Sequence, residues 1–283
     1  MQLNFIANES VPSMAGQTLD VIDPSDGQVF DQIQRSQAGD IDQAVTAARA
    51  AFNGPWGRLT AVERGRLLMA LSRKVGEHAA ELAALEQRDC GKPTKQAAAD
   101  AVALARYFEF YAGSCDKLHG ETLPYQNGYS VLTWREPHGV TGHIVPWNYP
   151  MQIIGRSVGA ALAMGNACVL KPAEEACLTA LAFAQLAAES GLPAGAHVAV
   201  DAHAVQRPRV KIERSSLQIK HVPTGYRRPC VASGFGAAFG SGFESRFFAG
   251  AGAGPISSDF TRALSTFSLC TARMCASKCF LQR

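Results

Sequence analysis

The sequence predicts an α/β protein with an incomplete doubly wound, Rossmann-like sheet, and three observations carry that prediction. Two apolar, strand-like segments, Val140–Val145 and Ala167–Leu170, flank a helical segment, Met151–Met164. A strand, a helix and a second strand within about thirty residues form a βαβ unit, whose strands are parallel and buried on both faces. A further helix, predicted over Ala176–Ser190, ends at Gly191 and extends the same pattern.

The N-terminal part begins with extended segments and a helix. Asp20–Phe30 has turn residues between apolar flanks and predicts strand, turn, strand. Asp40 is a residue type that caps helices, so we expect it to be the N-cap of a helix over Ile41–Phe52.

Two longer helices and a pair of strands are expected next. Thr60 and Glu63 have the spacing of a capping box, which opens one long amphipathic helix that continues until Cys90–Pro93 stops it. A third helix is predicted from about Thr94 to Ser114. Thr122–Pro137 then alternates in the manner of extended strands around the hairpin signal Asn127-Gly128.

The composition fits a soluble globular protein, with 47% hydrophobic and 18% charged residues among 283. No apolar run reaches the roughly 18 residues that a membrane span requires. The segment Met1–Ser10 lacks a basic start followed by an apolar core, so we expect no signal peptide, no membrane partner and a cytoplasmic location.

Charge divides the chain into two unequal parts. Residues 1–200 hold 15 basic and 20 acidic residues, a net of −5, whereas residues 201–283 hold 12 and 4, a net of +8. No helical or strand period persists in the second part. We therefore expect three regions: residues 1–139, helical with a hairpin; residues 140–200, the first part of a nucleotide-binding domain; and residues 201–283, a disordered or poorly folded tail.

The tail offers three weak functional signals. Cys270, Cys275 and Cys279 lack a paired C-x-x-C and a nearby histidine, so no metal site is expected. The glycine-rich stretch 234–242 follows no convincing strand. The arginines are dispersed and not interleaved with aromatic residues, which argues against nucleic acid as a partner.

Two motifs in the βαβ unit carry chemistry. Pro146–Pro150 follows the first strand, at the carboxyl edge where ligands of α/β sheets bind. The Asn148 amide could donate a hydrogen bond to an oxyanion, with the flanking prolines limiting its freedom. The alternative is a proline-rich turn around a buried Trp147.

The second strand ends in Lys171-Pro172-Ala173-Glu174. A lysine and a glutamate at that edge can hydrogen-bond the hydroxyls of a nucleotide ribose, and the acidic group disfavours a 2′-phosphate. NAD is therefore favoured over NADP. The alternative is an ordinary surface ion pair between Lys171 and Glu174.

Taken together, these motifs make the chain resemble the aldehyde dehydrogenase superfamily from near the N-terminus to about Ala196. The matching segments are Asp20–Phe30, Pro146-Trp147-Asn148-Tyr149-Pro150, Gly165-Asn166-Ala167-Cys168-Val169-Leu170-Lys171-Pro172-Ala173-Glu174 and Gly191-Leu192-Pro193-Ala194-Gly195.

The resemblance implies a role for each matching residue. Asn148 matches the catalytic asparagine that stabilises the oxyanion of the thiohemiacetal. Lys171 and Glu174 match the residues that hold the adenosine ribose, and Ala173 stands where many members have serine. The residues that match the contacts to the nicotinamide ribose and pyrophosphate side are Ile144, Val145, Pro146 and Trp147.

The resemblance also implies oxidation of a small aldehyde to a carboxylic acid with NAD(P), and a homo-oligomer paired through the hairpin arm Thr122–Pro137. The family's chemistry needs a nucleophilic cysteine and a general-base glutamate, which lie in G-Q-x-C and E-L-G-G-K motifs. Neither motif occurs in the 283 residues, nor does the F-T-G-S segment.

Three function hypotheses follow: an aldehyde-oxidising enzyme, a non-catalytic fragment or pseudoenzyme that binds nucleotide or a full-length partner, and a basic-tailed binding module. The first describes the family, and we expect this truncated chain to be inactive alone. Val222–Tyr226 resembles a family strand displaced along the chain, which suggests a tail that is unrelated or frame-shifted.

Overall fold

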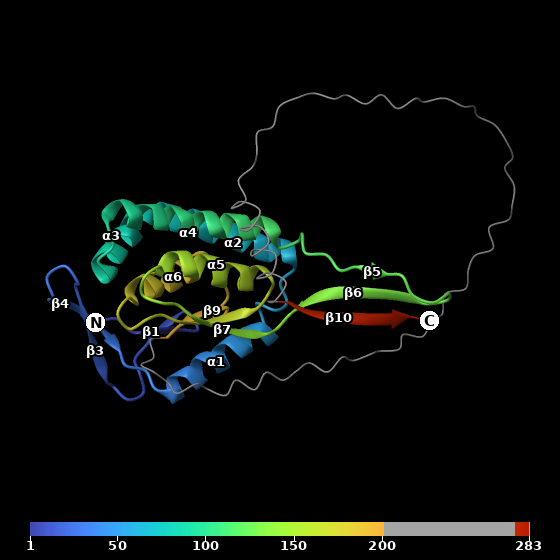
Figure 1. Ribbon diagram of the computed structural model, residues 1–283. Helices are drawn as coiled ribbons and strands as arrows, with labels where there is room; N and C mark the ends of the chain where they lie inside the picture. Colours follow the sequence, from blue (N-terminus) through green and yellow to red (C-terminus); the bar gives the residue numbers. More distant parts are fainter. Residues whose placement is uncertain (201–274, 283) are drawn as a thin grey trace, which may run out of the picture.

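A five-stranded sheet forms the centre of the computed structural model, which describes residues 1–200 and the backbone of residues 275–282 (Figure 1). The strand order is β2-β1-β9-β8-β7. The last three strands, β7 (Val140–Ile144), β8 (Ala167–Lys171) and β9 (His197–Ala199), are parallel, which confirms the βαβ prediction for β7 and β8 and adds β9 to it.

Two N-terminal strands extend this sheet and were not predicted. β1 (Asn4–Ile6) pairs antiparallel with β9, and β2 (Glu9–Val11) pairs antiparallel with β1. The connecting residues Ala7 and Asn8 have φ of 54° and 64°, so both central residues of this tight turn are left-handed. The N-terminal region thus completes the sheet that carries the site.

Burial separates the central strands from the edge strand. Every residue of β9 is buried, and so is all of β8 except its half-buried last residue, Lys171. The prediction that the first strand is also buried on both faces is wrong, since Ile144 in β7 is 80% exposed. The physical reason is position: among the described strands, none pairs with the outer edge of β7.

Helices cover both faces of the sheet (Figure 1). α1 (Ala38–Asn53) packs on one face, and α5 (Pro150–Ala163) and α6 (Leu178–Glu189) pack on the other. α2 (Ala61–Glu77) and α4 (Thr94–Ser114) form an outer layer that rests on α5.

Two predicted helices begin or break elsewhere. The long helix is interrupted at His78, whose ψ of 14° is not helical, and continues as α3 (Ala79–Cys90) in a direction that lets it pack on α4 and α6. The expected N-cap Asp40 is instead the third residue of α1. Its carboxylate accepts hydrogen bonds from the backbone N–H of Gln37 (2.7 Å) and of Met14 (2.8 Å). It still serves the helix N-terminus, but the helix begins three residues earlier than predicted, with Gln37 as the N-cap.

Other predicted boundaries are confirmed. Thr60 and Glu63 form the capping box of α2. Gly91 ends α3 in the left-handed conformation, with φ of 66°. The segment Asp20–Phe30 contributes to β3 (Thr18–Ile22) and β4 (Val29–Gln34), which form a separate two-stranded ribbon.

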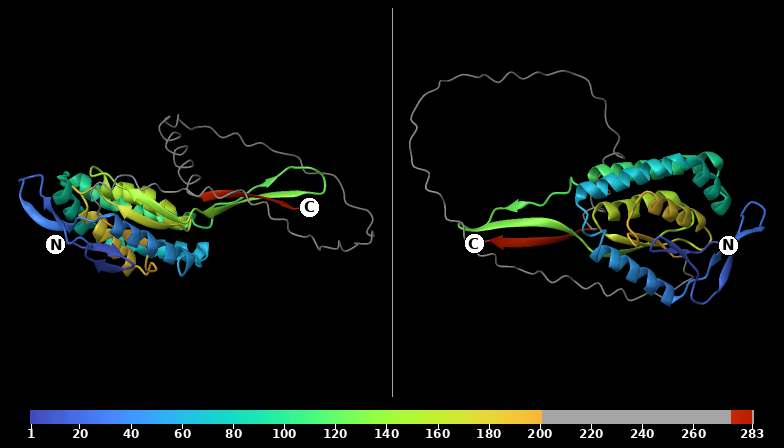
Figure 2. Two further views of the ribbon diagram at one scale, coloured as in Figure 1. Left: turned by 90° about the horizontal axis from the view of Figure 1, so that it is seen from below. Right: turned by 180° about the vertical axis from the view of Figure 1, so that it is seen from behind.

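An arm projects from the body of the molecule in every view (Figures 1 and 2). β5 (Thr122–Leu123) and β6 (Ser130–Pro137) form the predicted hairpin, and Gly128 takes a φ of 86° in its turn. β10 (Cys275–Gln282) pairs antiparallel along the whole of β6, and no strand is predicted for these residues from the sequence. No helix within residues 1–200 is long and apolar enough to span a lipid bilayer.

Candidate functional site

Two neighbouring parallel strands deliver both predicted motifs to one edge of the sheet. Ile144 pairs with Lys171 in the ladder between β7 and β8, and the backbone N–H of Val145 donates to the Lys171 carbonyl at 2.9 Å. The loops that follow, 146–150 and 172–177, therefore start side by side. This is the carboxyl edge at which α/β sheets bind ligands.

The first loop exposes its functional side chain. Pro146, Trp147, Asn148 and Tyr149 are all exposed, while Val145 before them is buried. The alternative interpretation, a turn around a buried tryptophan, is wrong because Trp147 is 58% exposed. Within residues 1–200 no group hydrogen-bonds the Asn148 amide, so both of its N–H bonds are available to a ligand.

The second loop holds its two functional groups half-buried. Pro172 is buried, and Lys171, Ala173 and Glu174 lie at intermediate exposure. The alternative of an ion pair between Lys171 and Glu174 is not found: among the described residues, nothing pairs with the Lys171 ammonium. A bridge between Ala173 and Ala176 closes the turn into α6.

A hollow of about 470 Å³ joins the two loops to the N-terminal ribbon. Trp147 comes from the first loop and Glu174 from the second, so residues from both predicted motifs line one space. The other lining residues come from the ribbon, the end of α3 and the second loop: Leu19, Asp20, Ile22, Pro24, Asp89, Cys90 and Glu175.

A group of buried charges lies behind the first loop. Lys92 directs its ammonium between the carboxylates of Glu86 and Asp100, forming an ion pair with each; the distance to Asp100 Oδ2 is 2.7 Å. We call these three residues the α3–α4 charge cluster. Gln96 and Gln152 each donate to Asp100 Oδ1 at 2.7 Å, so the cluster also contacts α5.

Burial and ion pairing shift the pKa values of the charge cluster in opposite directions. Burial raises the pKa of Glu86, and the nearby negative charge of Asp100 adds to that shift. Burial alone would also raise the pKa of Asp100, but hydrogen bonds from Lys92 and two glutamines outweigh it and hold that pKa below its usual value. Hydrogen bonds to both carboxylates likewise outweigh burial and raise the pKa of Lys92.

The C-terminal end of α3 also forms hydrogen bonds with the first turns of α5 and α6, the two helices that follow the site loops. Glu86 accepts a hydrogen bond from the backbone N–H of Met151 in the first turn of α5 (3.4 Å). Asp89 accepts one from the backbone N–H of Leu178 at the start of α6 (2.9 Å). Carboxylates at helix N-termini satisfy unpaired N–H groups and complement the helix dipole.

This charged helix end was missed in the sequence, although a signal existed. Glu86 and Asp89 fall on the apolar face of α3, which also carries Leu82 and Ala83. Charged residues at those helical positions predict buried, paired groups. The sequence pattern at Cys90–Pro93 indicates only the end of a helix.

The described thiols are poor candidates for a nucleophile. Burial raises the pKa of Cys168 to about 12 and that of Cys115 to about 11. Burial, reinforced by the charges of Glu86 and Asp89, raises the pKa of Cys90 to about 12. Since the thiolate is the reactive form, these three side chains stay unreactive near neutral pH. Cys177 is buried at the start of α6.

Several predictions concern residues that the structure does not describe. The cysteines of the tail, the glycine-rich stretch 234–242 and Val222–Tyr226 lie outside the described side chains. Within residues 1–200, no group of three or more His, Cys, Asp or Glu side chains is arranged to hold a metal ion.

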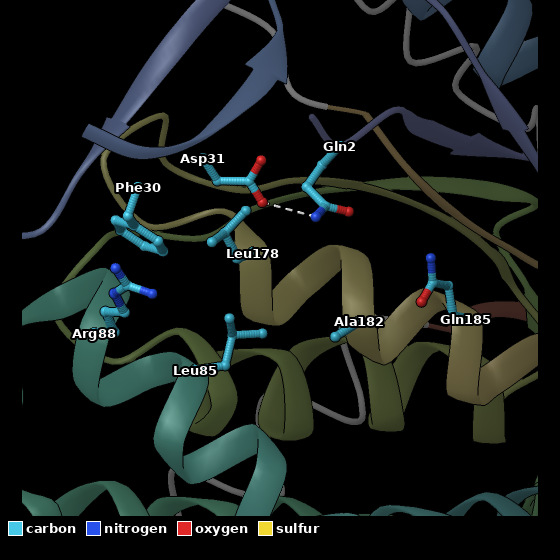
Figure 3. A pocket seen from close by; sticks show the side chains of 8 residues that line it. All are labelled: Gln2, Phe30, Asp31, Leu85, Arg88, Leu178, Ala182 and Gln185. Carbon is cyan, nitrogen blue, oxygen red and sulfur yellow. Dashed lines mark hydrogen bonds between the residues drawn. The ribbon is translucent and has the colours of Figure 1, made fainter.

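A second hollow, of about 380 Å³, lies between β4, α3 and α6 (Figure 3). Arg88 lies over the ring of Phe30, 4.2 Å from its centroid, and donates to Asp23 at 3.2 Å. Gln2 donates to Asp31 at 2.8 Å across the mouth. No residue of the two predicted motifs lines this hollow.

Comparisons with known proteins relate the greater part of the chain to one protein family. The model of the aldehyde dehydrogenase family matches residues 11–208, somewhat beyond the Ala196 limit of the motif resemblance. Aldehyde dehydrogenase family 2 member B4, mitochondrial, of Arabidopsis thaliana is 46% identical over 193 residues, which are 68% of this chain and 36% of that protein.

Two solved structures match the same region. A Burkholderia cenocepacia structure assigned to the aldehyde dehydrogenases is 67% identical with a TM-score of 0.70, covering 71% of this chain and 42% of that one. PnpE, solved with nicotinamide adenine dinucleotide, is 37% identical with a TM-score of 0.70 and the same coverage. The chain thus spans about two fifths of the length of the relatives that it matches.

Proposed function

Because the chain belongs to the aldehyde dehydrogenase family, we propose that residues 140–200 form the first part of the NAD-binding domain of an enzyme that oxidises an aldehyde to a carboxylic acid. Residues 1–139 supply the supporting helices and the arm. The observation that carries the proposal is the edge shared by β7 and β8, where an asparagine amide and a lysine ammonium, neither with a partner within residues 1–200, follow neighbouring strands.

The second loop is the proposed site for the adenosine ribose. The Lys171 ammonium donates to a ribose hydroxyl, and the Glu174 carboxylate accepts from one. A carboxylate at this position repels a 2′-phosphate, which favours NAD over NADP. One relative in the solved structures carries NAD, and Ala173 leaves the neighbouring position without a hydroxyl.

The first loop is the proposed site of the nicotinamide side and of the reacting carbonyl. The proposed contacts of the nicotinamide ribose and pyrophosphate side are Ile144, Val145, Pro146 and Trp147. The Asn148 amide donates to the oxygen that becomes negatively charged when a thiolate attacks the aldehyde carbon. A nicotinamide cofactor held at this edge would supply the hydride acceptor for the oxidation.

We assign neither the nucleophile nor the base to residues 1–200, because the G-Q-x-C and E-L-G-G-K motifs do not occur in the 283 residues. The described thiols whose pKa values are raised by burial cannot supply a thiolate. We therefore propose that the 283-residue chain binds nucleotide without oxidising aldehydes by itself. The arm is the proposed surface for pairing with a second copy or with a full-length relative, and the cytoplasm is the proposed compartment.

Saturation-transfer NMR with NAD tests the ribose site, because it detects weak binding through individual ligand protons. We expect transfer to the adenosine ribose protons of NAD, and weaker transfer with NADP. Lys171→Met and Glu174→Gln should each weaken NAD binding roughly five- to tenfold, which corresponds to the loss of one hydrogen bond of about 1–1.4 kcal/mol. Lys95→Met changes a lysine outside the site and is the matched control.

Equal NAD binding by all variants would remove the ribose-site proposal. Stronger binding of NADP than of NAD would reverse the assignment of Glu174.

A further inference from the structure

Three polar side chains of the first loop, Trp147, Asn148 and Tyr149, make no side-chain hydrogen bond to any described residue. The loop carries prolines at both ends, which restrict the backbone but do not fix where the loop lies on the protein. Something else must therefore hold the Asn148 amide at one place.

The α3–α4 charge cluster contacts this loop at its C-terminal end, where the loop enters α5. The Lys92 ammonium lies 4.6 Å from the centroid of the Tyr149 ring, within the range of a cation–π contact. Glu86, the ion-pair partner of Lys92, accepts from the Met151 N–H directly after the loop. One buried ion pair thus contacts the residue after Asn148 and the first turn of α5.

Burial makes this contact rigid. The side chains of Glu86 and Asp100 are fully buried and that of Lys92 is 7% exposed. The ammonium is fixed by two carboxylates, and Asp100 is in turn held by Gln96 and Gln152. A charge held in this way cannot move away from the tyrosine ring without losing an ion pair in a low-dielectric interior.

We propose that Lys92, held by Glu86 and Asp100, is a positioning residue that fixes the Asn148 loop through the ring of Tyr149. This inference rests on the proposed function, since the loop needs a fixed position only if Asn148 binds a reacting oxygen. Lys92 acts from behind the loop through Tyr149, and no contact of Lys92 with substrate is required.

The test measures loop order directly and needs no turnover. In a Trp134→Phe background, Trp147 is the exposed tryptophan of the described region and Trp56 is fully buried. Fluorescence anisotropy then reports motion of the loop, and hydrogen exchange of the Met151 amide reports its contact with Glu86. We expect Tyr149→Leu to raise that exchange rate about three- to tenfold and to lower the anisotropy of Trp147.

Matched variants separate positioning from general stability. Tyr149→Phe keeps the ring and should behave as the parent protein. Lys92→Met should reproduce the effect of Tyr149→Leu. Lys74→Met removes a lysine that pairs with Glu189 at 2.7 Å on another face, and should leave the loop unchanged. Should Lys92→Met fail to fold, the comparison of Tyr149→Leu with Tyr149→Phe still shows whether the ring of Tyr149 holds the loop.

Equal exchange rates and anisotropy for Tyr149→Leu and Tyr149→Phe would overturn the positioning role. This result is independent of NAD: unchanged NAD binding by Lys171→Met and Glu174→Gln would remove the proposed function, whereas the loop measurements would still show whether Lys92 holds Tyr149.

Discussion

The α3–α4 charge cluster and the histidines of the sheet bury ionisable groups in opposite ways. Lys92 forms ion pairs with Glu86 and with Asp100, so each of the three groups has a partner of opposite sign. His143 and His197 lie on β7 and β9, and His197 is almost fully buried, with no hydrogen-bond partner for either ring nitrogen among residues 1–200. The interior tolerates charge only where a partner balances it.

The histidines consequently stay neutral in the folded protein. Burial lowers the pKa of His143 to about 4. Burial, with a smaller contribution from His143, lowers the pKa of His197 to about 3. His197 packs edge-on against the ring of Phe183, an apolar partner that does not favour a charged imidazole.

Breaking the charge cluster should have the largest effect on stability. Lys92→Met leaves two buried carboxylates without their cation, which costs about 3–5 kcal/mol of unfolding free energy. Urea unfolding followed by circular dichroism measures the loss. The triple variant Lys92→Met, Glu86→Gln, Asp100→Asn removes all three charges and should recover most of it; a single-variant loss below about 1 kcal/mol would contradict the account.

The histidines should control stability in mild acid. Both pKa values are lower in the folded state than the ordinary value of 6.5, so the unfolded chain binds more protons below that pH. Unfolding free energy should therefore fall as pH drops from about 6.5 towards 4, by up to about 1.4 kcal/mol per pH unit for each histidine.

His197→Leu should remove roughly half of that dependence, as measured by urea unfolding at a series of pH values. His119→Leu replaces an exposed histidine and is the control. An unchanged pH dependence in His197→Leu would show that other groups cause the acid loss.

The smallest effect is expected for a charge pair at the surface. Lys74 and Glu189 form an ion pair between α2 and α6, with 30% and 55% of their side chains exposed. Lys74→Met should change the unfolding free energy by less than about 1 kcal/mol, and added salt should reduce even that difference. A loss as large as that of Lys92→Met would mean that the exposed and the buried ion pair contribute equally to the unfolding free energy, whatever their burial.

The parts of the fold that follow from local pattern could be predicted from sequence. The βαβ unit, the Thr60–Glu63 capping box and the Gly91 helix end depend on residue spacing within a few turns. The β1–β9 pairing and β10 could not be predicted, because strand partners far apart in sequence leave no periodic signal. The break at His78 was missed because the apolar spacing continues through it.

The candidate site shows the same limit. The motifs located Asn148, Lys171 and Glu174, and the parallel pairing of β7 with β8 places their loops at one edge. The groups behind the loop came from α3 and α4, and no spacing rule connects Lys92 with Tyr149. That connection exists only in the packed structure.

The most direct test of the account is NADH formation at 340 nm by the purified 283-residue chain with NAD and a panel of small aldehydes. We expect no turnover above that of a heat-denatured control, because neither the G-Q-x-C nor the E-L-G-G-K motif occurs in the 283 residues and burial raises the pKa values of Cys90, Cys115 and Cys168. Turnover that survives repurification and is lost in Asn148→Ala would contradict it, and would show that the chain supplies its own nucleophile.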